Sequence, residues 1–552
     1  MKRTDYRVVG GAFALGLGWL VSTGIGGQPL VPPMCSIEPA PVNPLEVAMF
    51  SMLPPEQQAQ LAAGYVHMQA QAFERFDEPF AATDERYEKV AHVMSRDRFE
   101  QLSDAHRRVL VRMAEREEYG EVPMAACFAP GTDPQLVWEF SEMLYNTSSR
   151  FQQTTRWNNT ATDGPGVGGQ GRPITLTYSF VPDGTNLSGS GSSSSLFSWL
   201  NGIYGSPANW QPLFDQVFDR WEELTGVTYV YEANDDGVPF STSANPGVLG
   251  VRGDVRIGAV PIDGNFNILA FNDFPNDGDM VFDAGDNFFN FTGNNSIRLR
   301  NVAAHEHGHG LGMLHVCPQN NTKLMEPSAS TGFDGPQTDD ILNGQRHYGD
   351  PLEVNGDFNE LGEPGFPGIL LSNLSIDDNS DIDFFQVDLS VPATLFVNVS
   401  PTGGSYLSGT QTQACNNGST FNADSIHDLS LVVLEDNFIT EVAASDNAPA
   451  GGTEFISVDI LTPGTYFIRV MGDATNNIQG YQLTVSSIDL PMQGCNEADL
   501  AEPFGTLDFS DVVAFLGAFG AMGADADLAP PFGTWDFSDV VTFLGAFGAG
   551  CP

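Results

Sequence analysis

Basic residues are scarce in this sequence. Its 552 residues include 23 Lys+Arg against 70 Asp+Glu, which gives a formal net charge of −47. Beyond Asp350 the only basic residue is Arg469. Nucleic-acid binding is excluded as a function class, because phosphates require basic patches and are repelled by a negative field. Cation binding, high solubility and a saline exterior fit this composition better.

Long apolar runs are also lacking, with one exception near the N-terminus. Lys2, Arg3 and Arg7 precede an apolar run over 8–21, and small residues suited to cleavage follow. This pattern predicts a secretory signal peptide over residues 1–29. The alternative is a retained membrane anchor, which is less favoured because the run is short and glycine-rich for a span of about 20 apolar residues. We therefore expect a secreted, extracellular or cell-surface protein with no membrane span after signal removal.

Cysteine is rare as well, and none of the six cysteines forms a C-x-x-C pair. An even number of cysteines in an exported chain permits disulfides without fixing their pairing. Cys495 and Cys551 bracket the last part of the chain and are candidates for pairing with each other.

The rest of the sequence divides into regions of different texture, as expected for a chain too long for one hydrophobic core. Residues 30–155 are rich in helix formers, with Thr132 as a predicted helix cap, Pro134 in the first turn and Gln135 at the capping-box position. Residues 156–350 alternate strand and helix patterns, which predicts an α/β or α+β domain with a mixed sheet. One amphipathic helix there has an apolar face formed by Trp210, Phe214, Val217, Phe218 and Trp221.

Two more regions complete the predicted multidomain architecture. Residues 351–490 contain short β-rich runs separated by Gly, Pro, Asn and Asp turns, which is the pattern of an all-β sandwich. Residues 495–552 contain a repeat, in which "ADLAEPFGTLDFSDVVAFLGAFG" recurs 28 residues later as "ADLAPPFGTWDFSDVVTFLGAFG". Each copy places an acidic loop before an apolar helix.

Histidine is sparse and unevenly placed. The chain has 9 histidines and none between His106 and His305, yet four lie in "HEHGHGLGMLH", residues 305–315. On a helix, His305 and His309 fall on one face a single turn apart and can share one metal ion. Gly312 then lets the chain leave the helix and return His315 as a third ligand. Three neutral imidazoles suit a tetrahedral zinc ion that keeps one open position.

The other residues of this run have different predicted roles. Glu306 lies about 100° around the helix from the first ligand, where it would serve as general base toward a zinc-bound water. His307 points nearly opposite to His305 and is predicted to be an exposed or packing residue. Gly308 and Gly310 are interpreted as tolerated weaknesses of the helix, each costing up to about 1 kcal/mol relative to alanine.

The extended pattern H-E-x-x-H-x-x-G-x-x-H resembles the zinc signature of the metzincin proteases. Met325 and Pro327 in "KLMEPSAS" resemble the methionine turn of the matrixin branch, in which the methionine forms an apolar floor under the zinc. The resemblance implies a zinc endopeptidase with a mixed twisted sheet and an active-site helix, acting on protein or peptide substrates through one catalytic zinc.

The matrixin resemblance extends upstream to "DGNFNILAF" and "GDMVFDAGD". It implies a calcium site in which Asp263, Asp283 and Asp286 give carboxylates and Gly264, Phe266 and Ile268 give carbonyls. Acidic surface loops without calcium are the alternative. Phe271 and Val281 stand where the family has histidines of a second, structural zinc, so that zinc is predicted to be absent.

The family resemblance also bears on residues 30–155, which are interpreted either as a pro-segment or as an ordinary helical domain. The family's pro-segment often blocks the zinc with a cysteine in a Pro-Arg-Cys-Gly context, which is missing here. Cys127 is the candidate for that part, but we favour a disulfide for it. Cys317 is a candidate partner.

The C-terminal regions carry looser resemblances. Residues 351–490 resemble pre-peptidase C-terminal domains, and 495–552 resemble a divergent dockerin-like tandem repeat for docking to a partner or a cell surface. The candidate calcium ligands of the repeats are Asp499, Asp508 and Asp511, with the counterparts Asp527, Asp536 and Asp539. Pro503 and Pro531 stand where an acidic residue is usual, and each loop is one residue longer than the usual twelve.

Three hypotheses follow for function. The preferred one is a secreted zinc endopeptidase. A non-enzymatic surface or scaffold-docked protein with a vestigial metal site is the alternative, and the presence of Glu306 with all three histidines argues against it. Hydrolysis of a non-peptide amide or ester is a third hypothesis that uses the same zinc chemistry.

Overall fold

A computed structural model describes residues 79–144, 152–187, 192–240, 246–353, 358–490 and 494–551. These ranges do not include the predicted signal peptide or residues 30–78, which contain Cys35. The chain forms two compact units, one of Met1–Pro351 with Ser405–Phe421 and the other of Leu352–Gly404 with Asn422–Pro552. Within the described ranges, every helix is too short or too polar to cross a bilayer.

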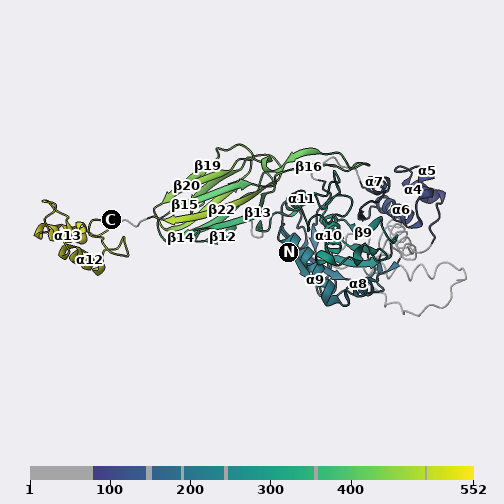
Figure 1. Cartoon of the computed structure of the whole chain (residues 1–552), viewed down its shortest axis with the longest axis horizontal. Coiled ribbons are helices and arrows are strands. Elements are labelled where there is room, and N and C mark those ends of the chain that lie inside the picture. Colours follow the sequence, from purple (N-terminus) through teal and green to yellow (C-terminus); the bar gives the residue numbers. More distant parts are fainter. Residues whose placement is uncertain are drawn as a thin grey trace, which may run out of the picture. The chain divides into compact units, whose positions relative to one another are not determined.

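The described part of the N-terminal region, from residue 79 on, contains the helices α4 (Asp84–Val90), α5 (Arg96–Gln101), α6 (Asp104–Tyr119) and α7 (Pro134–Glu142) (Figure 1). At the start of each helix, a side-chain oxygen accepts a hydrogen bond from a backbone N–H of the first turn. The accepting residues are Thr83, Ser95, Ser103 and Asp133. The prediction of Thr132 as the cap of α7 was wrong by one residue, because the Asp133 carboxylate accepts the Gln135 N–H.

The helical prediction for residues 30–155 also missed a strand, β1 (Met124–Phe128). It joins a six-stranded sheet of order β1-β9-β10-β8-β4-β7. The other strands are β4 (Ile174–Phe180), β7 (Val227–Tyr231), β8 (Val255–Val260), β9 (Ile268–Asp273) and β10 (Met280–Asp283). Strands β7, β4, β8 and β10 are parallel, whereas β9 runs antiparallel to β10 and to β1. The sheet is therefore mixed, as predicted.

One face of this sheet is covered by α8 (Leu196–Tyr204), α9 (Pro207–Glu222) and α10 (Gly293–Gly310). All five residues of the predicted apolar face of α9 are buried there. Helix α10 packs directly against α9 and β9 (Figure 1). Helix α11 (Thr338–Tyr348) closes the domain and contributes Tyr348 to the same core.

The opposite face of the sheet is covered by the N-terminal helices. Phe271 of β9 and Val281 of β10 are buried in one core with residues of α4 to α7. Alternate residues of a strand point to opposite faces, so each of these strands serves both cores. The N-terminal region is thus built into the hydrophobic core of the first unit.

The second unit contains two sheets that bury a shared core, which is a β-sandwich as predicted. One sheet has the order β12-β14-β21-β18-β19 and the other β13-β22-β15-β20. Their bounds are β12 (Phe358–Gly362), β13 (Ile369–Ile376), β14 (Ile382–Leu389), β15 (Ala393–Pro401), β18 (Ser430–Glu435), β19 (Glu441–Ser445), β20 (Glu454–Ile460), β21 (Gly464–Met471) and β22 (Gln479–Asp489).

One hairpin in the sandwich sequence belongs to the first unit. Strands β16 (Ser405–Thr410) and β17 (Ser419–Asn422) lie between β15 and β18 in sequence. They form a three-stranded sheet with β11 (Val316–Cys317), which directly follows the histidine run. We call residues 405–421 the inserted hairpin.

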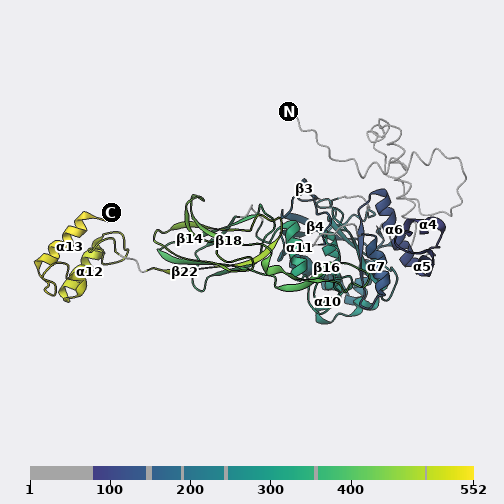
Figure 2. The same ribbon diagram turned by 90° about the horizontal axis from the view of Figure 1, so that it is seen from above.

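The terminal repeat folds into a pair of helices, α12 (Phe509–Gly520) and α13 (Phe537–Ala549), which lie side by side (Figure 2). Phe515 and Phe543 stack with ring centroids 4.1 Å apart. A disulfide joins Cys495 to Cys551, the two cysteines that were candidates for pairing with each other. The two equivalent apolar helices therefore bury their faces against each other, and the disulfide closes the pair.

Candidate metal centre and catalytic residues

The three predicted zinc ligands converge on one point. The Nε2 atoms of His305 and His309 are 3.1 Å apart, and each lies 3.2 Å from Nε2 of His315. Nitrogens about 2.0–2.1 Å from a tetrahedral ion are about 3.3–3.4 Å apart, so this spacing fits one zinc ion. All three side chains are buried. The donor set and its geometry therefore fit the ion that the sequence predicts.

Gly312 has the role that the sequence assigned to it. Its φ is +96°, in the region that side-chain-bearing residues avoid. A Cβ atom there would also lie 2.2 Å from the Thr155 carbonyl oxygen. Both constraints favour glycine at the point where the chain leaves α10 and turns toward His315.

The second nitrogen of each histidine has its own hydrogen-bond acceptor. Nδ1 of His305 lies 2.7 Å from the Leu324 carbonyl oxygen, and Nδ1 of His309 lies 2.7 Å from that of Met313. The partner of His315 Nδ1 is Oε1 of Gln411, at 3.0 Å. Donation from Nδ1–H leaves the Nε2 lone pair available for a metal. Burial lowers the pKa of His305 to about 4, so the ring is neutral at pH 7 as a ligand must be.

Glu306 lies beside this cluster and is fully buried. Among the described residues, neither of its carboxylate oxygens has a hydrogen-bond partner. Burial raises the pKa of Glu306 well above its usual range, and a backbone contact with Cys127 opposes that shift. A buried, unpartnered carboxylate next to three convergent imidazoles is a candidate for proton transfer.

His307 lies away from the metal cluster, in keeping with its predicted packing role. Its Nε2 is 2.6 Å from the Tyr229 hydroxyl, and its ring makes edge contacts with Phe218 and Tyr229. It is fully buried. Of the two alternatives left open by the sequence, exposed or packing, the second is correct.

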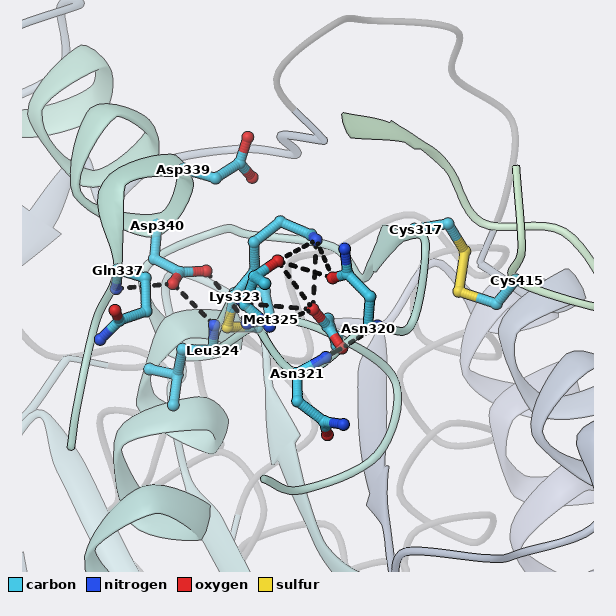
Figure 3. A network of polar contacts seen from close by, with 12 residues as sticks. Cys317, Asn320, Asn321, Lys323, Leu324, Met325, Gln337, Asp339, Asp340 and Cys415 are labelled. Atoms are coloured by element: carbon cyan, nitrogen blue, oxygen red, sulfur yellow. Dashed lines mark hydrogen bonds and ion pairs between the residues drawn. A yellow bond between two sulfur atoms is a disulfide. The ribbon is translucent and has the colours of Figure 1, made fainter. Parts of the chain in front are cut away.

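Two carboxylates that the sequence analysis missed shape the turn around Met325 (Figure 3). Asp340 of α11 accepts the backbone N–H groups of Leu324 and Met325. Glu326 accepts four N–H groups from residues 320–323. These bonds satisfy a loop that has few backbone partners of its own and hold Met325 buried against α10. Glu326 directly follows Met325, but no local spacing pointed to Asp340.

Strand β1 packs against α10, the helix that carries His305, Glu306 and His309. It pairs with β9 on one side, with Cys127 opposite Ala270. On the other side the Phe128 N–H donates to the Pro327 carbonyl, and the Ala329 N–H donates to the Phe128 carbonyl. Residues 127 and 128 therefore bridge the sheet edge and the segment after Met325. The sequence signal was a short apolar run, "MAACF", bounded by Pro123 and Pro130.

The disulfide prediction for Cys127 was wrong. Cys317 pairs with Cys415 of the inserted hairpin, and Cys127 is a buried free thiol. Burial raises its pKa well above the usual range, and the nearby Glu306 adds to the shift. The close metal-ligand group consists of the three histidines and does not include the Cys127 sulfur.

The predicted calcium loop is held together by backbone hydrogen bonds to its carboxylates. Asp283 accepts the N–H groups of Ile262, Asp263 and Gly264, and Asp286 accepts that of Phe266. Asp263 also contacts His106 of α6, with Oδ2 and Nε2 2.7 Å apart. Burial raises the pKa of Asp283 to about 7. Within the described ranges, the three carboxylates do not gather into a close ligand group, and calcium binding stays a prediction.

The candidate ligands of the terminal repeat serve as helix caps and loop acceptors. Asp508 and Asp511 form a capping box at the start of α12, as Asp536 and Asp539 do for α13. Asp499 and Asp527 accept N–H groups of Gly505 and Gly533. These interactions account for the capping carboxylates, whereas Oδ1 of Asp499 and of Asp527 is buried without a hydrogen-bond partner among the described residues. Calcium binding here also stays a prediction.

A comparison with protein families gives a match over the part of the chain that contains the metal centre. Residues 206–349 match the family described as Matrixin. The three histidines, Glu306 and Met325 all fall inside the matched segment. The comparison with curated proteins gives no match.

Two solved structures align with parts of the chain. The pre-peptidase C-terminal domain of a collagenase from Bacillus anthracis is 15% identical, has a TM-score of 0.16 and covers 23% of this chain and 94% of that domain. PliG of Aeromonas hydrophila, a periplasmic inhibitor of g-type lysozyme, is 12% identical, has a TM-score of 0.16 and covers 24% of this chain and 98% of its own. The architecture of the β region rests on its own strand pairings.

Proposed function

We propose that this protein is a secreted zinc-dependent endopeptidase whose general base is Glu306. The observation that carries the proposal is the convergence of three imidazole Nε2 atoms within 3.2 Å beside an unpartnered, buried carboxylate. The matrixin match over residues 206–349 supports peptide-bond hydrolysis as the reaction. Burial of apolar and polar atoms around the site supplies the low-dielectric surroundings in which such charges act strongly.

His305, His309 and His315 would hold the zinc, which when bound polarises the substrate carbonyl and lowers the pKa of a water. Glu306 takes the proton from the attacking water and passes it to the leaving amine. The three Nδ1 hydrogen bonds keep the rings in one orientation throughout the cycle.

In the described state the protease is latent, because β1 fills the edge of the sheet that a substrate strand would extend. An extended peptide adds to an open sheet edge through main-chain hydrogen bonds. Residues 127 and 128 already form main-chain hydrogen bonds with β9 and with Pro327–Ala329. The block is made by the backbone of β1, and the Cys127 sulfur is not a zinc ligand. Of the two interpretations of residues 30–155, this favours a pro-segment.

Export and docking complete the proposal. The basic and apolar start of the sequence and two disulfides fit an oxidising exterior. The terminal helix pair leaves Phe509 and Phe537 exposed, which supports attachment to a partner or a surface.

The test is proteolysis with and without zinc. The full chain is first treated by limited digestion that removes β1. The product is then incubated with a mixture of unfolded proteins. We expect new peptide termini, their loss on addition of a zinc chelator, and recovery with added zinc. Cleavage that a chelator leaves unchanged would refute the proposal, and hydrolysis restricted to small esters or amides would favour the non-peptide alternative. A zinc-loaded protein with no hydrolytic activity would favour the non-enzymatic scaffold.

A further inference from the structure

The metal centre is completed by residues from outside the segment that matches the matrixin family. The inserted hairpin, residues 405–421, lies in sequence between two sandwich strands but belongs to the same compact unit as the histidines. Its strand β16 pairs antiparallel with β11, with Thr410 opposite Val316 and Gly409 opposite Cys317. Strand β11 begins at the residue after His315, so this pairing fixes the backbone next to the third ligand.

A disulfide ties the hairpin to the same place. Cys317 is bonded to Cys415, and the Gln319 N–H donates to the Cys415 carbonyl at 2.7 Å (Figure 3). The cis-linked Pro318 packs against Gly418, where a Cβ atom would lie 2.7 Å from the proline ring. These contacts all join the hairpin to the two-residue strand that follows the metal ligand and to the residues just after it.

The hairpin also supplies a side chain to the site. Gln411 is 4% exposed, and its Oε1 lies 3.0 Å from His315 Nδ1. The other two ligands use backbone carbonyls of Leu324 and Met313, which lie within the matched segment. The acceptor for His315 Nδ1–H is therefore 96 positions away, whereas His305 and His309 donate to carbonyls nearer in the sequence.

We infer that Gln411 is a positioning residue of the zinc site, presented by the inserted hairpin and held there by the Cys317–Cys415 disulfide. The inference rests on the zinc site of the proposed function. Its amide oxygen accepts the Nδ1–H of His315, which fixes the ring orientation and selects the tautomer whose Nε2 lone pair faces the metal. Without that acceptor, His315 would populate other tautomers and orientations, and zinc would be bound more weakly.

The test compares three variants of the full chain. Gln411→Met keeps the length of the side chain but removes the acceptor, Gln411→Glu keeps an acceptor, and Gln413→Met alters an exposed residue of the same hairpin. Zinc affinity is measured by competition with a chromophoric chelator. We expect a 10- to 100-fold loss for Gln411→Met. Gln411→Glu is expected to stay within a few-fold of the parent, and Gln413→Met to be unchanged.

Two results would overturn the inference. Parent-like zinc affinity in Gln411→Met would show that the hydrogen bond is dispensable. Equal losses in Gln411→Met and Gln411→Glu would show that the side chain acts only through packing. A fourth variant, Cys317→Ala with Cys415→Ala, is expected to weaken zinc binding as well, because the hairpin loses its disulfide.

The readout separates this inference from the proposed function. Zinc affinity is measured without any proteolysis, so a chain that binds zinc through Gln411 but cleaves no protein would refute the endopeptidase and leave the inference standing. A Gln411→Met variant that cleaves protein and keeps parent-like zinc affinity would refute the inference and leave the endopeptidase proposal standing.

Discussion

The sulfur of Met325 occupies the space that a side chain at position 308 would need. A Cβ atom on Gly308 would lie 2.4 Å from the Met325 sulfur. The interpretation of Gly308 as a tolerated weakness of the helix was therefore wrong. Glycine at this position is what allows the methionine turn to approach α10 between the two helical ligands. Gly310 is under a milder constraint, since its Cβ would lie 3.0 Å from the Asn272 side-chain nitrogen.

Replacing Gly308 by alanine should therefore destabilise the catalytic unit, although alanine is the better helix former. Overpacking of this kind costs about 1–3 kcal/mol. We expect a lower unfolding midpoint for that unit and weaker zinc binding. The matched control is Gly202→Ala in α8, where a Cβ meets no atom within 4 Å and stability should rise by about 0.5–1 kcal/mol. Equal effects of the two variants would contradict this explanation.

The N-terminal region should loosen when its buried ion pair is broken. Arg116 of α6 contacts Asp273 of β9, and both are almost fully buried. Arg116→Met would leave the carboxylate uncompensated, at a cost of about 3–5 kcal/mol. The control, Arg96→Met, breaks a solvent-exposed pair with Asp84 and should change stability little. Denaturant unfolding measures both, and a small effect of Arg116→Met would show that the pair does not anchor this region.

Alkylation of the Cys127 thiol tests the proposed block by β1. The thiol lies in β1, is buried and has a raised pKa, so it should resist alkylation while β1 is in place. We expect labelling of Cys127 to appear together with proteolytic activity during limited digestion. Mass spectrometry of a Cys35→Ser variant follows the modification at this one free thiol. Rapid labelling before any activity, or activity with Cys127 still protected, would argue against a block by β1.

Stability should fall in acid partly because of His347. Burial, with the charges of Arg156 and Arg346, lowers its pKa from 6.5 to about 3. The unfolded chain therefore takes up the proton first. The contribution of buried, neutral His347 to the free energy of unfolding is complete above pH 6.5. It is lost as the pH falls toward 3, by up to about 1.4 kcal/mol per pH unit. In zinc-free protein, His347→Gln should flatten the dependence of unfolding free energy on pH; parallel curves for parent and variant would contradict this assignment.

Local patterns in the sequence predicted the metal centre well. Helical periodicity relates His305, Glu306 and His309, and the conformation needed at a helix end explains Gly312. A short stretch of sequence therefore contains the information that places these residues. The same holds for the apolar face of α9, because 3.6-residue spacing decides which side chains meet the core.

Features that depend on distant contacts could not be predicted in this way. β1 is a strand because the edge of β9 offers hydrogen-bond partners to "MAACF", and that edge is 140 residues away in sequence. Gln411 reaches His315 only because a hairpin leaves the sandwich, and no spacing within either segment reveals it. The same hairpin gave Cys317 a partner that the sequence analysis did not consider.

The most direct test of the account is the Glu306→Gln substitution. Glutamine keeps the size of the side chain but cannot take a proton from water. We predict that zinc binds with parent-like affinity while hydrolysis of an unfolded protein substrate falls by at least about 100-fold, the range attributed to a positioned general base. Undiminished cleavage by the zinc-loaded variant would contradict the role of Glu306 and with it the proposed mechanism.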